Sequence, residues 1–167
     1  MDRLAHQGGR PEGAEARGQV TDFLITGCGR SGTGWAAALF TELGFPCSHE
    51  GQFNLASHGP LRGGESSWLA IPHLDSLDPS TAILRIRRDP YEVVASAMAR
   101  GFLRDLDEPY SAYAIRHCPE IAQGAGRTDP LARVIRWVAL WDRPLLHRKG
   151  HGLKVEAPAN HVRLAVK

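Results

Sequence analysis

Short apolar runs alternate with segments of helical periodicity along most of the chain. Residues 23–26 and 81–86 are apolar runs bounded by turn residues, which is typical of buried strands. Between them, apolar residues recur at helical spacing from Thr33 to Leu43, and Gly44 follows where a helix commonly ends. The same patterns predict the remaining elements, which are helices over 89–100, 109–118 and 131–146, a short strand near 45–47 and a last strand over 153–156.

The order of these elements predicts the fold class. Strands that alternate with helices indicate an α/β protein, here a three-layer α/β/α arrangement around a central parallel sheet. Residues 51–79 are rich in Gly, Ser, His and Pro, and we interpret them mostly as loop with one short helix near 68–71. Residues 1–20 lack periodic apolar positions and are expected to form a disordered leader, so that 21–167 form a single domain.

Composition narrows the choice of partners. The formal net charge is only +2, which gives no indication of a nucleic-acid partner. The chain has no apolar run of the length that spans a bilayer, and its three cysteines show no paired spacing of a disulfide framework or a metal site. We therefore expect a cytoplasmic protein without membrane or metal partners, acting on a small molecule.

The most informative segment is the Gly-rich turn between the first strand and the first helix. Gly29 and Gly32 let the backbone curl closely around an anion, and the helix that follows presents free N–H groups at its positive end. Arg30 adds a guanidinium with donors matched to phosphate or sulfate oxygens, Ser31 and Thr33 add hydroxyl groups, and Trp35 is expected to pack at the base of the loop. The segment predicts a phosphate-binding turn.

This turn differs from the ATP-binding P-loop. Gly27 and Gly32 have the separation of that motif, but Thr33 stands where the motif has its Lys. The strand over 81–86 leads into arginines, so it offers no carboxylate for a magnesium ion. These departures disfavour an ATP-dependent phosphotransferase, which stays open as an alternative.

The same residues resemble the sulfotransferase family. Its loop of the type Pro-Lys-Ser-Gly-Thr-Thr-Trp binds the 5′-phosphosulfate of 3′-phosphoadenosine 5′-phosphosulfate (PAPS). Here Arg30 takes the place of the Lys and Gly34 that of the second Thr. The resemblance implies a P-loop-like sulfotransferase fold, PAPS as co-substrate without a metal, and a nucleotide site that includes Gly29, Arg30, Ser31, Gly32, Thr33, Gly34 and Trp35.

A second motif supports the resemblance. The family binds the 3′-phosphate with an Arg at a strand end and a Ser eight residues later on the next helix, and Arg88 and Ser96 have that spacing. Arg88 follows a core strand, where open α/β sheets bind ligands. The alternative is that Arg88 is a surface arginine paired with Asp89 or Glu92, and that Ser96 only packs.

Sulfuryl transfer to a hydroxyl acceptor needs a group that takes up the acceptor's proton. We favour Glu50, because Glu50 lies in a segment that resembles one in bacterial sulfotransferases, where a Glu ahead of a Phe is the base. His49, His58 and His73 are alternatives, since other branches of the family use His. With Arg30, Glu50 completes the predicted catalytic pair.

The resemblance has one clear departure. Family members carry a late Arg-Lys-Gly loop, and Arg148-Lys149-Gly150 matches those letters too early in the chain, which favours a chance match. The chain then ends where relatives continue. Three functions therefore remain open, namely a PAPS-dependent sulfotransferase, a truncated or non-catalytic remnant that binds the nucleotide, and an ATP-dependent phosphotransferase. The acceptor and the oligomeric state are not readable from the sequence.

Overall fold

The computed structural model describes residues 22–147 and the backbone of residues 151–154. The expected leader over 1–20 and the Arg148-Lys149-Gly150 match lie outside these residues. None of the helices in the described residues is long and apolar enough to cross a lipid bilayer.

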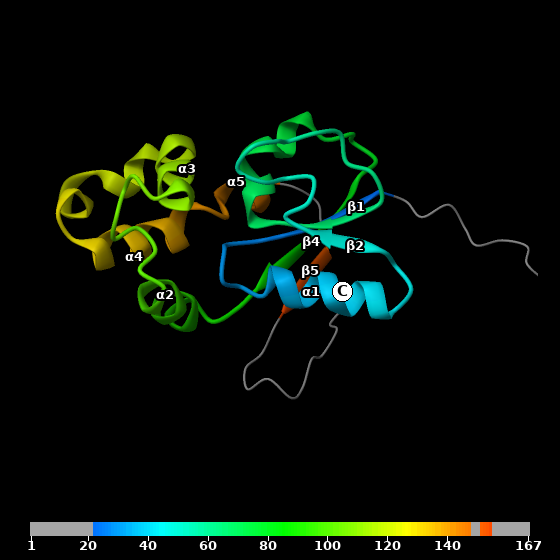
Figure 1. The fold of residues 1–167 in the computed structure, drawn as a ribbon, viewed down its shortest axis with the longest axis horizontal. Coiled ribbons are helices and arrows are strands. Elements are labelled where there is room, and N and C mark those ends of the chain that lie inside the picture. Colours follow the sequence, from blue (N-terminus) through cyan, green and yellow to red (C-terminus); the bar gives the residue numbers. More distant parts are fainter. Residues whose placement is uncertain (1–21, 148–150, 155–167) are drawn as a thin grey trace, which may run out of the picture.

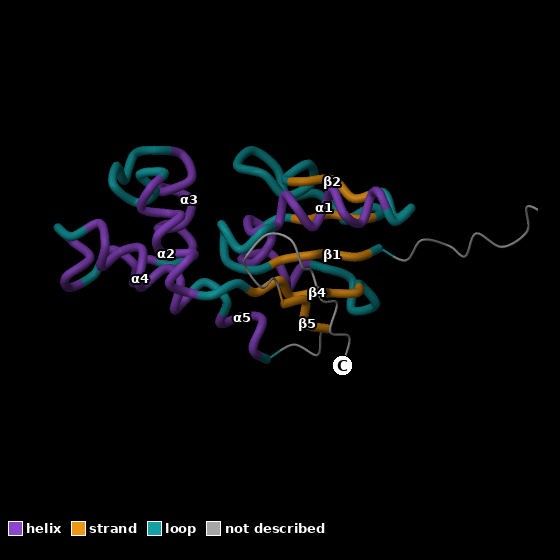
Figure 2. The backbone as a smooth tube through the Cα atoms, turned by 90° about the horizontal axis from the view of Figure 1, so that it is seen from below, coloured by secondary structure: helices purple, strands orange, loops and turns teal. Residues whose placement is uncertain are grey.

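A parallel sheet forms the centre of the molecule. In the described part of the chain it has five strands in the order β2-β3-β1-β4-β5 (Figure 2), and every neighbouring pair is parallel. The α/β class with a parallel sheet is therefore confirmed. The strands are β1 (Phe23–Thr26), β2 (Cys47–His49), β3 (Gly64–Ser66), β4 (Ala82–Arg87) and β5 (His151–Lys154).

The helices occupy three places around the sheet. Helix α1 lies along one face, and the 3-10 helix η1 lies on the opposite face (Figure 1). Helices α2, α3 and α4 gather beyond the ends of the strands, on the side where β1 leads into α1 (Figure 1). Their bounds are α1 Thr33–Glu42, η1 Trp68–Ser76, α2 Pro90–Ala99, α3 Pro109–His117, η2 Pro119–Ala122, η3 Gly124–Arg127, α4 Pro130–Leu140 and α5 Arg143–Leu146.

Successive side chains of β1 point to opposite faces of the sheet and pack into two separate apolar cores. Phe23 and Ile25 pack with Ala36 of α1, whereas Leu24 joins the larger core that includes Leu69 of η1 and Trp137 of α4. Because both faces of this central strand are covered, all of β1 is buried and its first three residues are apolar, as expected for the run over 23–26.

Local signals place α2 where the sequence predicts it. The Asp89 carboxylate accepts hydrogen bonds from the N–H groups of Tyr91 at 2.8 Å and Glu92 at 3.3 Å, and Pro90 occupies the first helical position. Asp89 and Glu92 have the spacing of a capping box, but the box is only half formed, because the Glu92 carboxylate pairs with Arg88 at 2.7 Å. Arg88 directly precedes the cap, and its guanidinium attracts the Glu92 carboxylate more strongly than a backbone N–H does.

Strand β3 lies where the sequence predicts mostly loop. Gly64, Glu65 and Ser66 contain no apolar side chain, yet all are buried beside β1. A Cβ at Gly64 would overlap the Phe23 ring, so only glycine fits there. The strand is stabilised by the close approach of its backbone to β1 and by hydrogen bonds of its polar side chains. Neither feature produces a hydrophobic pattern in the sequence.

The predicted helix over 131–146 is divided into α4 and α5. At the break, the Asp142 carboxylate forms an ion pair with Arg85 of β4 at 3.0 Å. Burial raises the pKa of Asp142, and the hydrogen bond and charge of Arg85 oppose that rise. The pair ties the end of α4 to the sheet.

Candidate functional site

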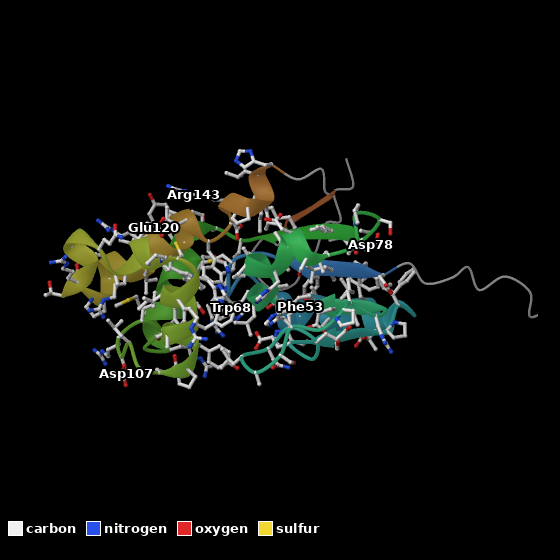
Figure 3. All side chains as sticks on the ribbon, turned by 90° about the horizontal axis from the view of Figure 1, so that it is seen from above. Phe53, Trp68, Asp78, Asp107, Glu120 and Arg143 are labelled. Carbon is white, nitrogen blue, oxygen red and sulfur yellow. The ribbon has the colours of Figure 1, made fainter. Side chains whose placement is uncertain are left out.

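A cleft of about 700 Å³ opens at the carboxyl edge of the sheet, next to the turn after β1. Strands β2 and β3 lie on one side of β1, and β4 and β5 lie on the other, so the strand order reverses direction between β1 and β4. Open α/β sheets bind ligands at such a switch point, at the carboxyl ends of the strands. Figure 3 places Trp68 at the junction between the sheet and the helices beyond it. The lining residues are Gly29, Arg30, Gly32, Thr33, Gly34, Trp35, His49, Glu50, Trp68, Arg88, Arg100, Gly101, Phe102, Glu108, Tyr110 and Trp137.

The turn after β1 has the backbone of an anion-binding loop. Arg30 has a φ of 67° and Gly32 a φ of 110°, and the N–H of Ser31 closes the turn on the carbonyl of Cys28 at 3.1 Å. Gly32 is the N-cap of α1 and no side chain caps this end. The first N–H groups of α1 thus keep their capacity to bind an anion.

Two aromatic rings form the floor of this loop. A Cβ on Gly29 would lie 2.9 Å from Cη2 of Trp137 and 3.2 Å from Cδ2 of Trp68, so the loop backbone rests directly on both rings. Trp35, which was expected at the base of the loop, is instead 40% exposed and faces the cleft. The expectation for Trp35 is therefore wrong. The ring that packs under the turn is instead Trp137 of α4, together with Trp68.

The two predicted motifs meet in space. Nε of Arg30 donates a hydrogen bond to Oγ of Ser96 at 3.0 Å, although these residues are 66 positions apart. Nη1 of Arg88 donates to the carbonyl of Arg30 at 3.3 Å, while its Nε pairs with Glu92. Arg88 therefore does pair with Glu92, as the alternative interpretation expects, but it also lines the cleft.

Two buried polar atoms near the loop have no hydrogen-bond partner among the described residues. They are Oγ of Ser31 and Nε1 of Trp137. Ser31 is 2% exposed and Trp137 is 1% exposed. Such atoms are uncommon in folded proteins. Both atoms are closed off from the cleft, and Ser31, which the resemblance assigns to the nucleotide site, is the one residue of the turn over 29–35 that does not line it.

The opposite wall of the cleft carries Glu50. Thr33 Oγ1 lies 3.2 Å from His49 Nε2, which lies 3.6 Å from Glu50 Oε1. The Tyr110 hydroxyl donates to Glu50 Oε2 at 3.5 Å. Burial raises the pKa of Tyr110, and the nearby carboxylates of Glu50 and Glu108 add to that rise.

Of the three histidines considered as bases, only His49 lines the cleft. His58 and His73 stack on each other with ring centroids 4.1 Å apart, and His73 Nε2 lies 3.0 Å from the Tyr113 hydroxyl. Burial lowers the pKa of His73, and the neighbouring His58 and His117 lower it further. The structure therefore brings His49 and Glu50 together and separates them from His58 and His73.

Several residues of the site carry no signal that sequence reasoning used. Tyr110 and Glu108 stand at the start of α3, Arg100 and Phe102 follow α2, and Trp137 lies on α4. Only Arg100 was noticeable in advance, as a cation one turn beyond Ser96. In the described ranges, no group of three or more His, Cys, Asp or Glu is placed to hold a metal ion.

Comparison with known proteins adds no relative. No protein-family model, no curated protein and no solved structure matches the chain. The sulfotransferase resemblance therefore stays a prediction that rests on the residues of the two motifs and on the cleft beside them, which all of these residues except Ser31 and Ser96 line.

Proposed function

We propose that this chain is a sulfotransferase that moves a sulfuryl group from PAPS to a hydroxyl acceptor. The observation that carries the proposal is the hydrogen bond between Arg30 and Ser96. It joins the residue expected at the phosphosulfate with one expected at the 3′-phosphate. Because β1 and β4 are neighbouring parallel strands, the segments that follow them meet at one edge of the sheet, and the two motifs can serve a single nucleotide.

The nucleotide half of the cleft has suitable chemistry. The guanidiniums of Arg30 and Arg88 and the N–H groups at the start of α1 surround the loop and can stabilise negative charge on a leaving phosphate. Ser96 accepts its hydrogen bond from Arg30, so its own O–H proton stays available for a phosphate oxygen.

The acceptor half supplies the proton transfer. In the proposed step the acceptor oxygen bonds to sulfur, the bond between sulfur and the bridging phosphate oxygen breaks, and Glu50 takes up the acceptor's proton. The leaving group is adenosine 3′,5′-bisphosphate. Tyr110 donates to one oxygen of Glu50, which leaves the other oxygen for the proton. His49 stands beside this second oxygen as the nearest titratable group.

Calorimetry separates this function from ATP-dependent phosphotransfer. We expect adenosine 3′,5′-bisphosphate to bind and ATP with magnesium to bind at least tenfold more weakly, because the loop has Thr33 in place of the P-loop Lys. Arg30→Ala and Arg88→Ala should each weaken bisphosphate binding roughly 10- to 100-fold, the loss of a hydrogen bond to a charged group. Arg62→Ala is the matched control, since the exposed Arg62 precedes β3 and does not line the cleft. A preference for ATP would refute the proposal.

A second measurement separates an enzyme from a non-catalytic nucleotide-binding protein. Transfer of labelled sulfate from PAPS to a panel of sugars and phenols tests turnover directly. Glu50→Gln should retain bisphosphate binding and lower kcat by roughly 10²- to 10⁴-fold, the usual contribution of a positioned base. Bisphosphate binding with no transfer to any acceptor would favour the non-catalytic alternative.

A further inference from the structure

A carboxylate outside the cleft holds the segment that carries Glu50. Glu65 lies on β3 and is fully buried, at 0% exposed. It does not line the cleft. Burial of an ionisable side chain is unfavourable unless its oxygens find donors, so the partners of Glu65 indicate its role.

Among the described residues, the side chain of Glu65 accepts hydrogen bonds only from one short segment, residues 48–53. Its Oε1 accepts from the N–H of Gly51 at 3.0 Å and from the N–H of Phe53 at 3.5 Å, and its Oε2 accepts from the Ser48 hydroxyl. These contacts lie on both sides of Glu50 in the sequence. A single buried carboxylate therefore fixes the segment before and after the candidate base.

Glu50 itself needs such support. Its φ is 51°, a left-handed conformation that is unfavourable for a residue with a side chain. Its own side-chain contacts are long, at 3.5 Å to Tyr110 and 3.6 Å to His49. The N–H of Glu50 donates to the carbonyl of Ser66 at 3.2 Å, which fixes the backbone but not the turn that follows. The Gly51 and Phe53 contacts of Glu65 define that turn.

We propose that Glu65 is a positioning residue, which holds Glu50 in its left-handed conformation so that the Glu50 carboxylate faces the cleft. This inference rests on the proposed function for the role of Glu50, but the contacts themselves do not. Replacing Glu65 with Gln keeps the volume but leaves one acceptor oxygen in place of two and puts an NH2 group at the position of the other. The three donors of residues 48–53 then share a single acceptor, so the segment loses support without losing its packing.

Amide hydrogen exchange tests the anchor without any activity. In Glu65→Gln, the amides of Gly51 and Phe53 should exchange about fivefold faster or more, while those of α2 and α4 keep their protection. Ser48→Ala, which removes one of the three donors, should give a smaller change at the same amides and covers the case in which Glu65→Gln fails to fold. Glu42→Gln is the control, because Glu42 is exposed on α1. Unchanged exchange at Gly51 and Phe53, or a uniform increase over the whole sheet, would overturn the proposal.

Kinetics then test the consequence for Glu50. Glu65→Gln should bind adenosine 3′,5′-bisphosphate within about twofold of the wild type and keep its KM for PAPS, while kcat falls at least tenfold. The loss should also be small when Glu50→Gln is already present, because both variants remove the same positioned carboxylate. A full kcat in Glu65→Gln would overturn the proposal. If the wild type binds no bisphosphate, the proposed function fails, and the exchange result still decides whether Glu65 anchors the segment.

Discussion

Alanine substitutions at Gly29, in the turn after β1, and at Gly34, in the first turn of α1, should have opposite effects on stability. Gly29 and Gly34 both have ordinary negative φ values, so alanine is compatible with either backbone. They differ in the space around them. A Cβ on Gly29 would lie 2.9 Å from the Trp137 ring, whereas a Cβ on Gly34 would lie 3.5 Å from the His49 ring, an ordinary contact.

The magnitudes follow from that difference. Gly29→Ala should lower the free energy of unfolding by about 1–3 kcal/mol, the usual effect of an extra carbon in a packed site. Gly34→Ala should raise it by about 0.5–1 kcal/mol, since Gly34 lies in α1 and glycine is unfavourable in helices. For a chain of this size, Tm should fall by about 2–12 °C in the first variant and rise by about 1–4 °C in the second.

Thermal and urea unfolding of the purified variants checks both values. Gly29→Ala should also weaken bisphosphate binding roughly tenfold, because the loop must move away from Trp137 and lose a hydrogen bond to the ligand. A Gly29→Ala protein at least as stable as the wild type would refute the packing argument. If Gly29→Ala is stable but binds the bisphosphate more weakly, then glycine is needed at this position for contact with the ligand and not for packing.

Two further predictions concern stability. Arg85→Ala should destabilise the fold by about 3 kcal/mol, because it leaves the Asp142 carboxylate buried without its partner. The double variant Arg85→Ala, Asp142→Asn should recover part of this loss, and urea unfolding of both proteins tests the prediction. The free energy of unfolding should also decline as the pH falls below 6.5, the usual pKa of His. The pKa values of His73 and His117 are lowered in the folded protein, so the unfolded chain takes up protons at a higher pH than the folded chain does and is stabilised by them. His73→Gln should flatten this decline between pH 7.5 and 5.5, and an unchanged slope would contradict the assignment.

Elements with strong local signals were predictable. Helix α2 begins at Pro90 because Asp89 caps it and the proline suits its first turn, and these determinants lie within four residues of one another. The same holds for α1 and its end before Gly44. The strand over 23–26 was equally clear, since burial on both faces favours consecutive apolar residues such as Phe23, Leu24 and Ile25.

Elements defined by distant partners were not predictable. Strand β3 is stabilised by what surrounds Gly64 and Glu65, namely the Phe23 ring and the donors of residues 48–53, so its own three residues look like a loop. In the site, Arg30, Arg88 and Ser96 were singled out by two motifs in the sequence, and the structure brings the three residues together, while their binding roles stay predictions. Trp137 could not, because only the tertiary fold brings α4 beneath the turn.

The contacts of Arg30 have a consequence for how the cleft can open. Arg30 binds α2 through Ser96, and Arg88 just ahead of α2 binds back to the Arg30 carbonyl, so the turn and α2 are linked at two points and should move as one rigid body. Across the cleft, the recorded hydrogen bond between Glu50 and Tyr110 is a long one of 3.5 Å. For ligand entry and exit we therefore expect the exposed Tyr110 side chain to swing away from Glu50, while the Tyr113 hydroxyl, which donates to the carbonyl of Leu69 at 2.6 Å, holds α3 in place and the anion loop keeps its shape.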